Sequence, residues 1–130
     1  MEKYLDISKE QFMEFLQFPM EGRLQMLNLL KFKIKVEETG LTGEAQYRQY
    51  MKEALPFFQK SNANILFLGS AKISFIGPAD EWDKVLIVEY QKKEDFVNMI
   101  TAEGYPAHLR KMSLEDSRLI YCKSTGEDQV

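Results

Sequence analysis

The sequence predicts an α+β fold with one four-stranded antiparallel sheet and two helices on one of its faces. After a short helix, strand-like and helix-like patterns follow one another in the order β, α, β, β, α, β. Two split βαβ units in this order give the ferredoxin-like arrangement, in which the first and third strands are central. The length of 130 residues fits one such domain.

The first half of the chain predicts a helix, a strand and a longer helix. Ser8 is a suitable N-cap for the first helix, which Pro19 and Gly22 end. Residues 24–34 alternate between two faces, one of them apolar apart from Asn28. A second helix starts near Thr42 or Gly43, and Pro56 either kinks it or begins another short helix.

The second half predicts two strands, a helix, a further helical turn and a last strand. Residues 63–75 are strand-like, with a bulge expected at Gly69. Residues 84–90 form the third strand, 95–101 a helix, 107–112 a helical turn and 117–123 the last strand. We therefore expect a helical extension over residues 1–22, the ferredoxin-like domain over 23–124 and a flexible tail over 125–130.

Composition and charge exclude several classes of protein. The formal net charge is −3 and the pI is about 5.3, so general affinity for nucleic acid or anionic membranes is not expected. The N-terminus does not resemble a secretory signal, and the apolar runs are far shorter than the ~18 residues of a membrane span. Cys122 is the single cysteine and is expected to be a buried thiol. These features predict a cytoplasmic protein.

Two predicted strands are apolar on both faces, although two helices cover only one face of the sheet. These stretches are residues 65–68 and 85–88. An exposed apolar face of this size is unusual in a monomer. We therefore predict a homodimer that pairs the open sheet faces of two copies. The alternative is that the N-terminal helix covers this face.

Three stretches resemble the domain-of-unknown-function family 1330 of the dimeric α/β-barrel superfamily. They are residues 26–32, residues 81–90, and a C-terminal motif with Tyr105, His108, Arg110 and residues 116–120. The resemblance covers residues 24–122 and implies a dimer. Relatives in the superfamily include cofactorless monooxygenases, lactone isomerases, haem-degrading enzymes and non-catalytic stress proteins, so the fold does not select an activity.

Asn28 and Glu89 are polar residues in otherwise apolar strands. A buried Asn28 either satisfies a neighbouring group or donates its NH₂ to a ligand oxygen. A buried Glu89 could act as a general base or acid, but a salt bridge to Lys31 or Lys33 is the favoured interpretation.

The only histidine, His108, suits proton transfer, although a structural or exposed role is more common for a lone histidine. Arg110 could hold a carboxylate. We expect a pocket between the sheet and the helices near Asn28, Tyr50, Tyr90 and His108, in which Arg110, Tyr50, Tyr90 and Glu89 bind the substrate and His108 and Asn28 are catalytic.

Metal and cofactor sites are not predicted. One histidine and one cysteine make no zinc site, and no glycine-rich phosphate loop follows a strand. Haem-degrading relatives use an Asn, a Trp and a His, but Trp82 precedes the third strand and is expected to be a structural or interface anchor. The sequence thus predicts a protein that binds or transforms a small organic molecule without a metal. The alternative is a non-catalytic binding or stress-response dimer.

Overall fold

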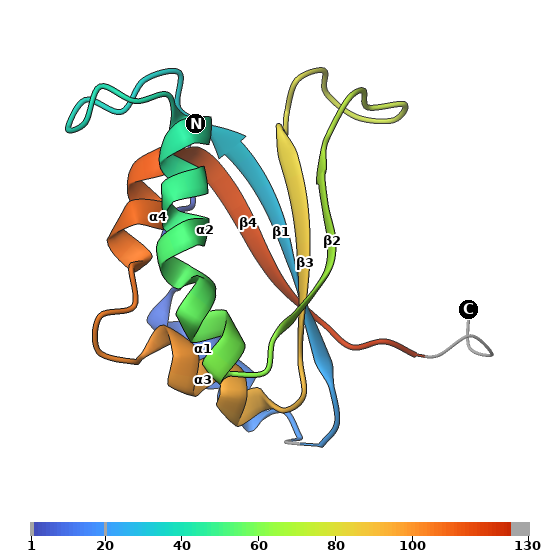
Figure 1. Cartoon of the computed structure of the whole chain (residues 1–130). Coiled ribbons are helices and arrows are strands. Elements are labelled where there is room, and N and C mark those ends of the chain that lie inside the picture. Colours follow the sequence, from blue (N-terminus) through green and yellow to red (C-terminus); the bar gives the residue numbers. More distant parts are fainter. Residues whose placement is uncertain (1, 20, 126–130) are drawn as a thin grey trace.

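The computed structural model describes residues 2–19 and 21–125 (Figure 1). Its elements are α1 (Lys9–Gln17), β1 (Leu24–Phe32), α2 (Gly43–Lys60), β2 (Asn64–Ser70), β3 (Lys84–Tyr90), α3 (Lys93–Ile100), α4 (Ala107–Ser113) and β4 (Leu114–Cys122). The predicted tail lies outside the described residues from residue 126 onward.

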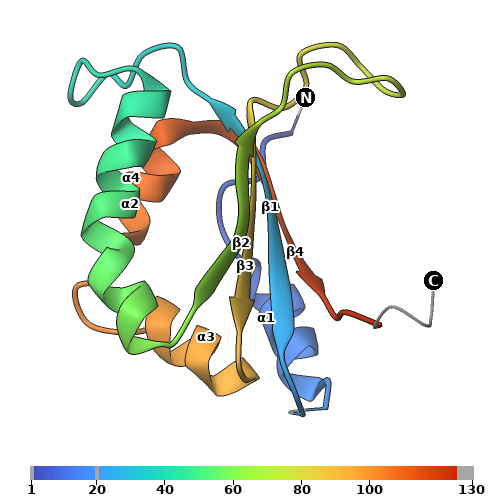
Figure 2. The same ribbon diagram turned by 45° about the vertical axis from the view of Figure 1, so that its right-hand side comes forward.

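The four strands form one antiparallel sheet in the order β2-β3-β1-β4. Helices α2, α3 and α4 lie on one side of this sheet, as Figures 1 and 2 show. The ferredoxin-like prediction is confirmed, including the central position of β1 and β3.

The core lies between the sheet and the helices. Alternate residues of β1 and β3 point into it, because successive side chains of a strand point to opposite faces. On β1 these are Leu24, Met26 and Leu30, and on β3 they are Leu86, Val88 and Tyr90. This face is called the inner face below, and the opposite one the outer face.

The helix starts agree with the predicted caps. The side-chain oxygen of Ser8 accepts a hydrogen bond from the N–H of Gln11, and that of Thr42 accepts one from the N–H of Ala45. Pro56 lies within one uninterrupted helix, α2, so the second short helix is not formed.

Three strands differ from their predicted extent. Strand β4 begins at Leu114, three residues before its predicted start. Strand β2 ends at Ser70, and its register shifts between Ile65 and Phe67, so the bulge predicted at Gly69 lies nearer the start of the strand. Strand β1 ends at Phe32, and Ile34 is exposed. Cys122 is half-buried on the outer face beside Gln25, not in the core as predicted.

Helix α1 packs on the helix side of the sheet. The ring of Phe15 contacts Phe96 of α3 and Tyr121 of β4, with centroids 5.8 and 5.1 Å apart. The Lys93 ammonium is buried and donates hydrogen bonds to the backbone carbonyls of Phe15 and Phe18, where α1 ends. The alternative in which this helix covers the open face is therefore wrong.

The outer face is an apolar surface that no helix covers among the described residues. Phe67, Ile87, Leu27 and Ile120 are paired in register and form one row across all four strands. Phe67 and Ile120 are exposed by 52% and 43%. Strand β3 is thus apolar on both faces, as predicted: Leu86 and Val88 point into the core, and Ile87 lies on the outer face.

Within residues 2–19 and 21–125, no helix has the length and apolar character needed to cross a membrane.

Gly43 lies where the chain returns from the loop after β1, and it leaves no room for a side chain. Its N–H donates to the carbonyl of Lys33, and the N–H of Lys33 donates to the carbonyl of Ser113. A Cβ at this position would lie 2.4 Å from the Lys33 oxygen and 2.5 Å from the Ser113 oxygen. The close approach joins β1, α2 and α4.

We expect Gly43→Ala to lower the free energy of unfolding by about 2 kcal/mol or more, because the backbone clash outweighs the ~1 kcal/mol helix preference of alanine. Urea unfolding followed by circular dichroism measures this. The control is Gly40→Ala, which has a positive φ of 76° and open space around it, and should cost only about 1–2 kcal/mol. A Gly43→Ala protein as stable as the wild type would contradict the packing at this junction.

Candidate functional site

A cavity of about 460 Å³ lies between the inner face of the sheet and the helices. Its floor is formed by Met26 and Asn28 of β1 and by Leu86, Val88 and Tyr90 of β3. The opposite wall is mostly aromatic, with Tyr47, Tyr50 and Phe58 of α2, Phe96 of α3 and Tyr105 of the connection between α3 and α4. A space of this size and character is typical of a site for a small organic molecule.

Arg110 and Asn28 form the polar centre of this cavity. The Nη2 atom of Arg110 donates a hydrogen bond to the Oδ1 atom of Asn28 at 3.0 Å. A guanidinium can only donate, so the amide oxygen must face Arg110 and the NH₂ group must point away. The NH₂ group lies 3.4 Å from the carbonyls of Met26 and Leu86. Asn28 therefore holds Arg110 in place, and its own donors face the backbone instead of the cavity.

The positive charge of Arg110 has no carboxylate partner within residues 2–19 and 21–125. Every ion pair found in this part of the chain joins other residues. Asp6 is an acidic residue of the cavity lining, and its carboxylate pairs with Lys111 at 2.9 Å. A partly buried cation that an amide oxygen orients and no anion neutralises favours binding of an anion.

Four tyrosines around Arg110 remain protonated donors at neutral pH. Burial raises the pKa of Tyr47 to about 12, although the Arg110 guanidinium acts in the opposite direction. Burial also raises the pKa values of Tyr50, Tyr90 and Tyr105. The hydroxyl groups of Tyr50 and Tyr105 are hydrogen-bonded to each other. Because no tyrosinate forms near neutral pH, these residues leave the charge of Arg110 uncompensated.

His108 is an exposed residue at the edge of the same cavity, two positions before Arg110 on α4. The structure thus brings together Asn28, Arg110, Tyr50, Tyr90 and His108 around one cavity. Their placement agrees with the predicted pocket, and their chemical roles stay predictions.

Glu89 does not join this group. It lies on the outer face, where it pairs in register with Gln25 of β1. Its carboxylate accepts a hydrogen bond from the side chain of Gln25 at 2.9 Å and lies 3.8 Å from Arg23. Neighbouring residues of a strand point to opposite faces, so Glu89 and Tyr90 cannot both enter the cavity. The predicted partners Lys31 and Lys33 are replaced by Gln25 and Arg23.

Sequence reasoning missed the contributions of Tyr47, Tyr105 and the N-terminal segment to the cavity. Tyr47 and Tyr50 are three residues apart on α2, and this spacing signals a shared helix face. Leu5, Asp6, Ile7 and Phe12 also line the cavity, although this segment was expected to be an added element. No short-range signal connects these residues to the distant α4.

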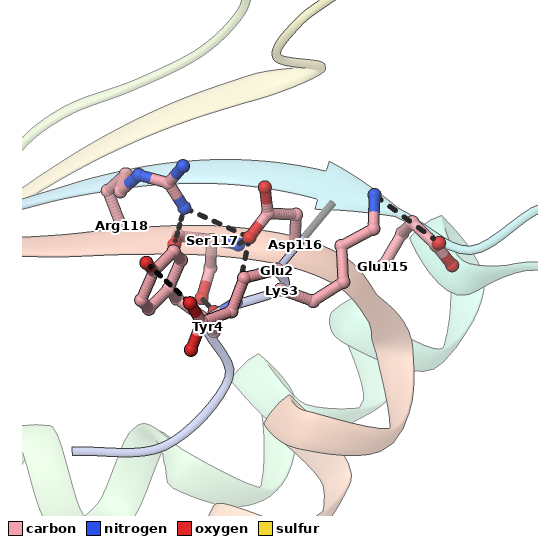
Figure 3. A network of polar contacts seen from close by, with 7 residues as sticks. All are labelled: Glu2, Lys3, Tyr4, Glu115, Asp116, Ser117 and Arg118. Atoms are coloured by element: carbon pink, nitrogen blue, oxygen red, sulfur yellow. Dashed lines mark hydrogen bonds and ion pairs between the residues drawn. The ribbon is translucent and has the colours of Figure 1, made fainter. Parts of the chain in front are cut away.

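The N-terminal segment is attached to strand β4 by a polar network, drawn in Figure 3. The backbone N–H of Tyr4 donates to Asp116, and its carbonyl accepts from the Ser117 hydroxyl. Burial acts to raise the pKa of Asp116, but the N–H groups of Tyr4 and Ser117 and the Arg118 guanidinium lower it overall. The ionised Asp116 thus holds this segment beside the cavity.

Trp82 lies outside the cavity lining and is half-buried. The guanidinium of Arg118 lies 5.1 Å from its ring and 4.8 Å from the ring of Tyr4. Trp82 therefore packs against Arg118 of β4, which agrees with the structural role expected for it. Its role at an interface stays a prediction.

Across residues 2–19 and 21–125, no group of three or more His, Cys, Asp or Glu side chains is arranged to hold a metal ion.

Comparison with known proteins identifies two close structures of one protein. No protein-family model and no curated protein matches the sequence. The methylated RPA0582 protein is 31% identical, with a TM-score of 0.90 over 99% of this chain and 100% of that one. A second structure of RPA0582, a protein of unknown function from Rhodopseudomonas palustris, is 32% identical, with a TM-score of 0.88 over 96% and 99%.

A more distant neighbour is similar in fold alone. SnoaB, described as a cofactor-independent oxygenase from Streptomyces nogalater, is 9% identical, with a TM-score of 0.53 over 85% of this chain and 100% of that one.

We expect stability to fall as the pH rises above the ordinary tyrosine pKa of 10.0 toward the value of about 12 for Tyr47. The folded state keeps protons in this range that the unfolded state has lost, so the contribution is fully present below pH 10 and lost above it. The slope should be about 1.4 kcal/mol for each pH unit and each buried tyrosine.

Urea unfolding at a series of pH values measures this slope. Tyr47→Phe should reduce it. Val36→Ala, which truncates a buried side chain outside the core cluster that contains the tyrosines, should change stability without changing the slope. Equal slopes in the wild type and Tyr47→Phe would show that the Tyr47 hydroxyl is not held in its protonated form.

Proposed function

The chain belongs to the family of the RPA0582 protein, and from this premise we propose that it binds a small, mostly apolar organic molecule that carries an anionic group. Family membership alone does not select the ligand, because RPA0582 is itself described as a protein of unknown function. The main support for this proposal is the guanidinium of Arg110, which has no carboxylate partner among the described residues and lies in an apolar and aromatic cavity.

The lining suggests how such a ligand would be held. Its anionic group would accept hydrogen bonds from Arg110 and from the neutral hydroxyls of neighbouring tyrosines. Its apolar part would lie against the aromatic rings of Tyr47, Tyr50 and Phe96 and against Met26 and Val88. Asn28 is then a positioning residue that acts through Arg110.

We further propose that the protein transforms this ligand without a metal. Donors that hold a bound anion also stabilise an oxyanion that forms during a reaction. His108 at the cavity edge could exchange protons with solvent. The similar fold of SnoaB, described as a cofactor-independent oxygenase, is a precedent for such chemistry, but it assigns no role to any residue of this chain. A non-catalytic binding or stress-response protein remains the alternative, and mass spectrometry of the released ligand distinguishes the two by the presence of a product.

We expect Arg110→Met to weaken the binding of phenylacetate by about 10- to 100-fold, the range for losing a hydrogen bond to a charged group. Isothermal titration calorimetry measures the dissociation constants. Arg48→Met removes an equal charge from the exposed, Glu44-paired Arg48 and is the control. Binding that is equally tight in Arg110→Met and the wild type would contradict the proposed anion site.

We also propose that two copies pair through their outer faces, in the cytoplasm, and that the chain is a member of family 1330. Support for the pairing comes from the apolar row of Phe67, Ile87, Leu27 and Ile120. A ferredoxin-like protein from Bacteroides fragilis, 14% identical with a TM-score of 0.51 over 82% of this chain and 100% of that one, is described as dimeric.

Ile87→Lys should convert a dimer into a monomer, because pairing would bury an unneutralised ammonium. Light scattering should give about twice 15.2 kDa for the wild type and 15.2 kDa for the variant. Leu55→Lys places the same charge on the exposed surface of α2 and should remain dimeric. A monomeric wild type at micromolar concentration would refute the pairing.

A further inference from the structure

A second cavity, of about 830 Å³, lies between the N-terminal segment with α1 and strand β4. It is called the α1 groove below. Several residues line both this groove and the first cavity, among them Leu5, Phe12, Met26, Phe96, Arg110 and Leu119.

These shared residues surround a junction between the two spaces. Met26 and Leu119 belong to neighbouring strands of the sheet and form its floor. Leu5 and Phe12 belong to the N-terminal segment and α1, on the opposite side. The shared residues therefore place the two spaces next to each other, with Arg110 on their common border.

Arg110 lies at this junction and lines both spaces. An anion bound to its guanidinium would therefore face the aromatic cavity on one side and the α1 groove on the other. The other arginine of the groove, Arg118, is already paired with Asp116 at 2.9 Å. Arg110 is thus the cation available to a ligand at the point where the spaces meet.

The far part of the groove is lined by aromatic rings. Phe18 and Phe15 both contact the ring of Tyr121 edge to face, with centroids 5.4 and 5.1 Å apart. Phe18 is 45% exposed, although it is a large apolar residue, and it lines the groove and not the first cavity. Its open face offers apolar surface that a ligand could cover.

We propose that the ligand carries its anionic group between two apolar arms, one in the aromatic cavity and one in the α1 groove. This inference rests on the proposed function, since it uses the same contact with Arg110. It adds that the ligand class is a branched amphipathic acid and not a linear one, with the second arm attached next to the anionic group.

Two isomeric acids test the branching. 2-Phenylhexanoate carries a butyl chain beside its carboxylate, whereas 4-butylphenylacetate carries the same chain at the far end of the ring. We expect 2-phenylhexanoate to bind ~10-fold or more tightly than phenylacetate, from partial burial of a chain whose methylenes are each worth up to about fourfold. The isomer should show no such gain. Equal affinities of the two isomers for the wild type would overturn the proposal without the need for any variant.

Phe18→Ala locates the second arm. It should remove most of the gain of 2-phenylhexanoate while the affinity for phenylacetate stays unchanged. A full gain in a folded Phe18→Ala protein would overturn the proposed position of the arm. Failure of the proposed function has a different signature, since phenylacetate binding would then be independent of Arg110.

Discussion

The hydrogen bond between Arg110 and Asn28 joins the helix layer to the centre of the sheet. Asn28 is 6% exposed and stands in register between Leu86 and Leu119, so its amide must find partners inside the protein. Its contacts with the backbone carbonyls are long, at 3.4 Å, which leaves the guanidinium as its best partner. A single polar residue in an apolar strand thereby determines where the cavity holds a positive charge.

The fold and part of the site could be predicted because their signals are local. Alternation along residues 24–32 is enough to place Asn28 on the same face as the inward apolar residues of its strand. The same rule, applied strictly, separates Glu89 from Tyr90, because adjacent residues of a strand face opposite sides. In the sequence, Glu89 is a functional candidate because it is a polar residue in an apolar strand. On the outer face, however, a carboxylate needs only a surface partner, and Gln25 and Arg23 provide it.

The remaining parts of the site depend on contacts between distant segments. Tyr4 meets Asp116 and Ser117, more than a hundred residues later, through backbone groups that carry no sequence signal. The register of β4 and the position of α1 against Phe96 and Tyr121 decide that the N-terminal segment lines the cavity. A helical extension that reads as an addition to the fold is therefore part of the site.

Neighbouring residues of β1 serve the two faces of the sheet, the proposed dimer interface on one side and the cavity on the other. Leu27 and Leu29 point to the outer face, and Asn28 between them points to the cavity. A strand whose outer face was left in water would gain little from keeping Leu27 and Leu29 in place. Strand β1 is already paired on both sides, with β3 and with β4, so the single chain holds the backbone of Asn28 in place. The proposed dimer and the proposed anion site thus use neighbouring residues of one strand on opposite faces.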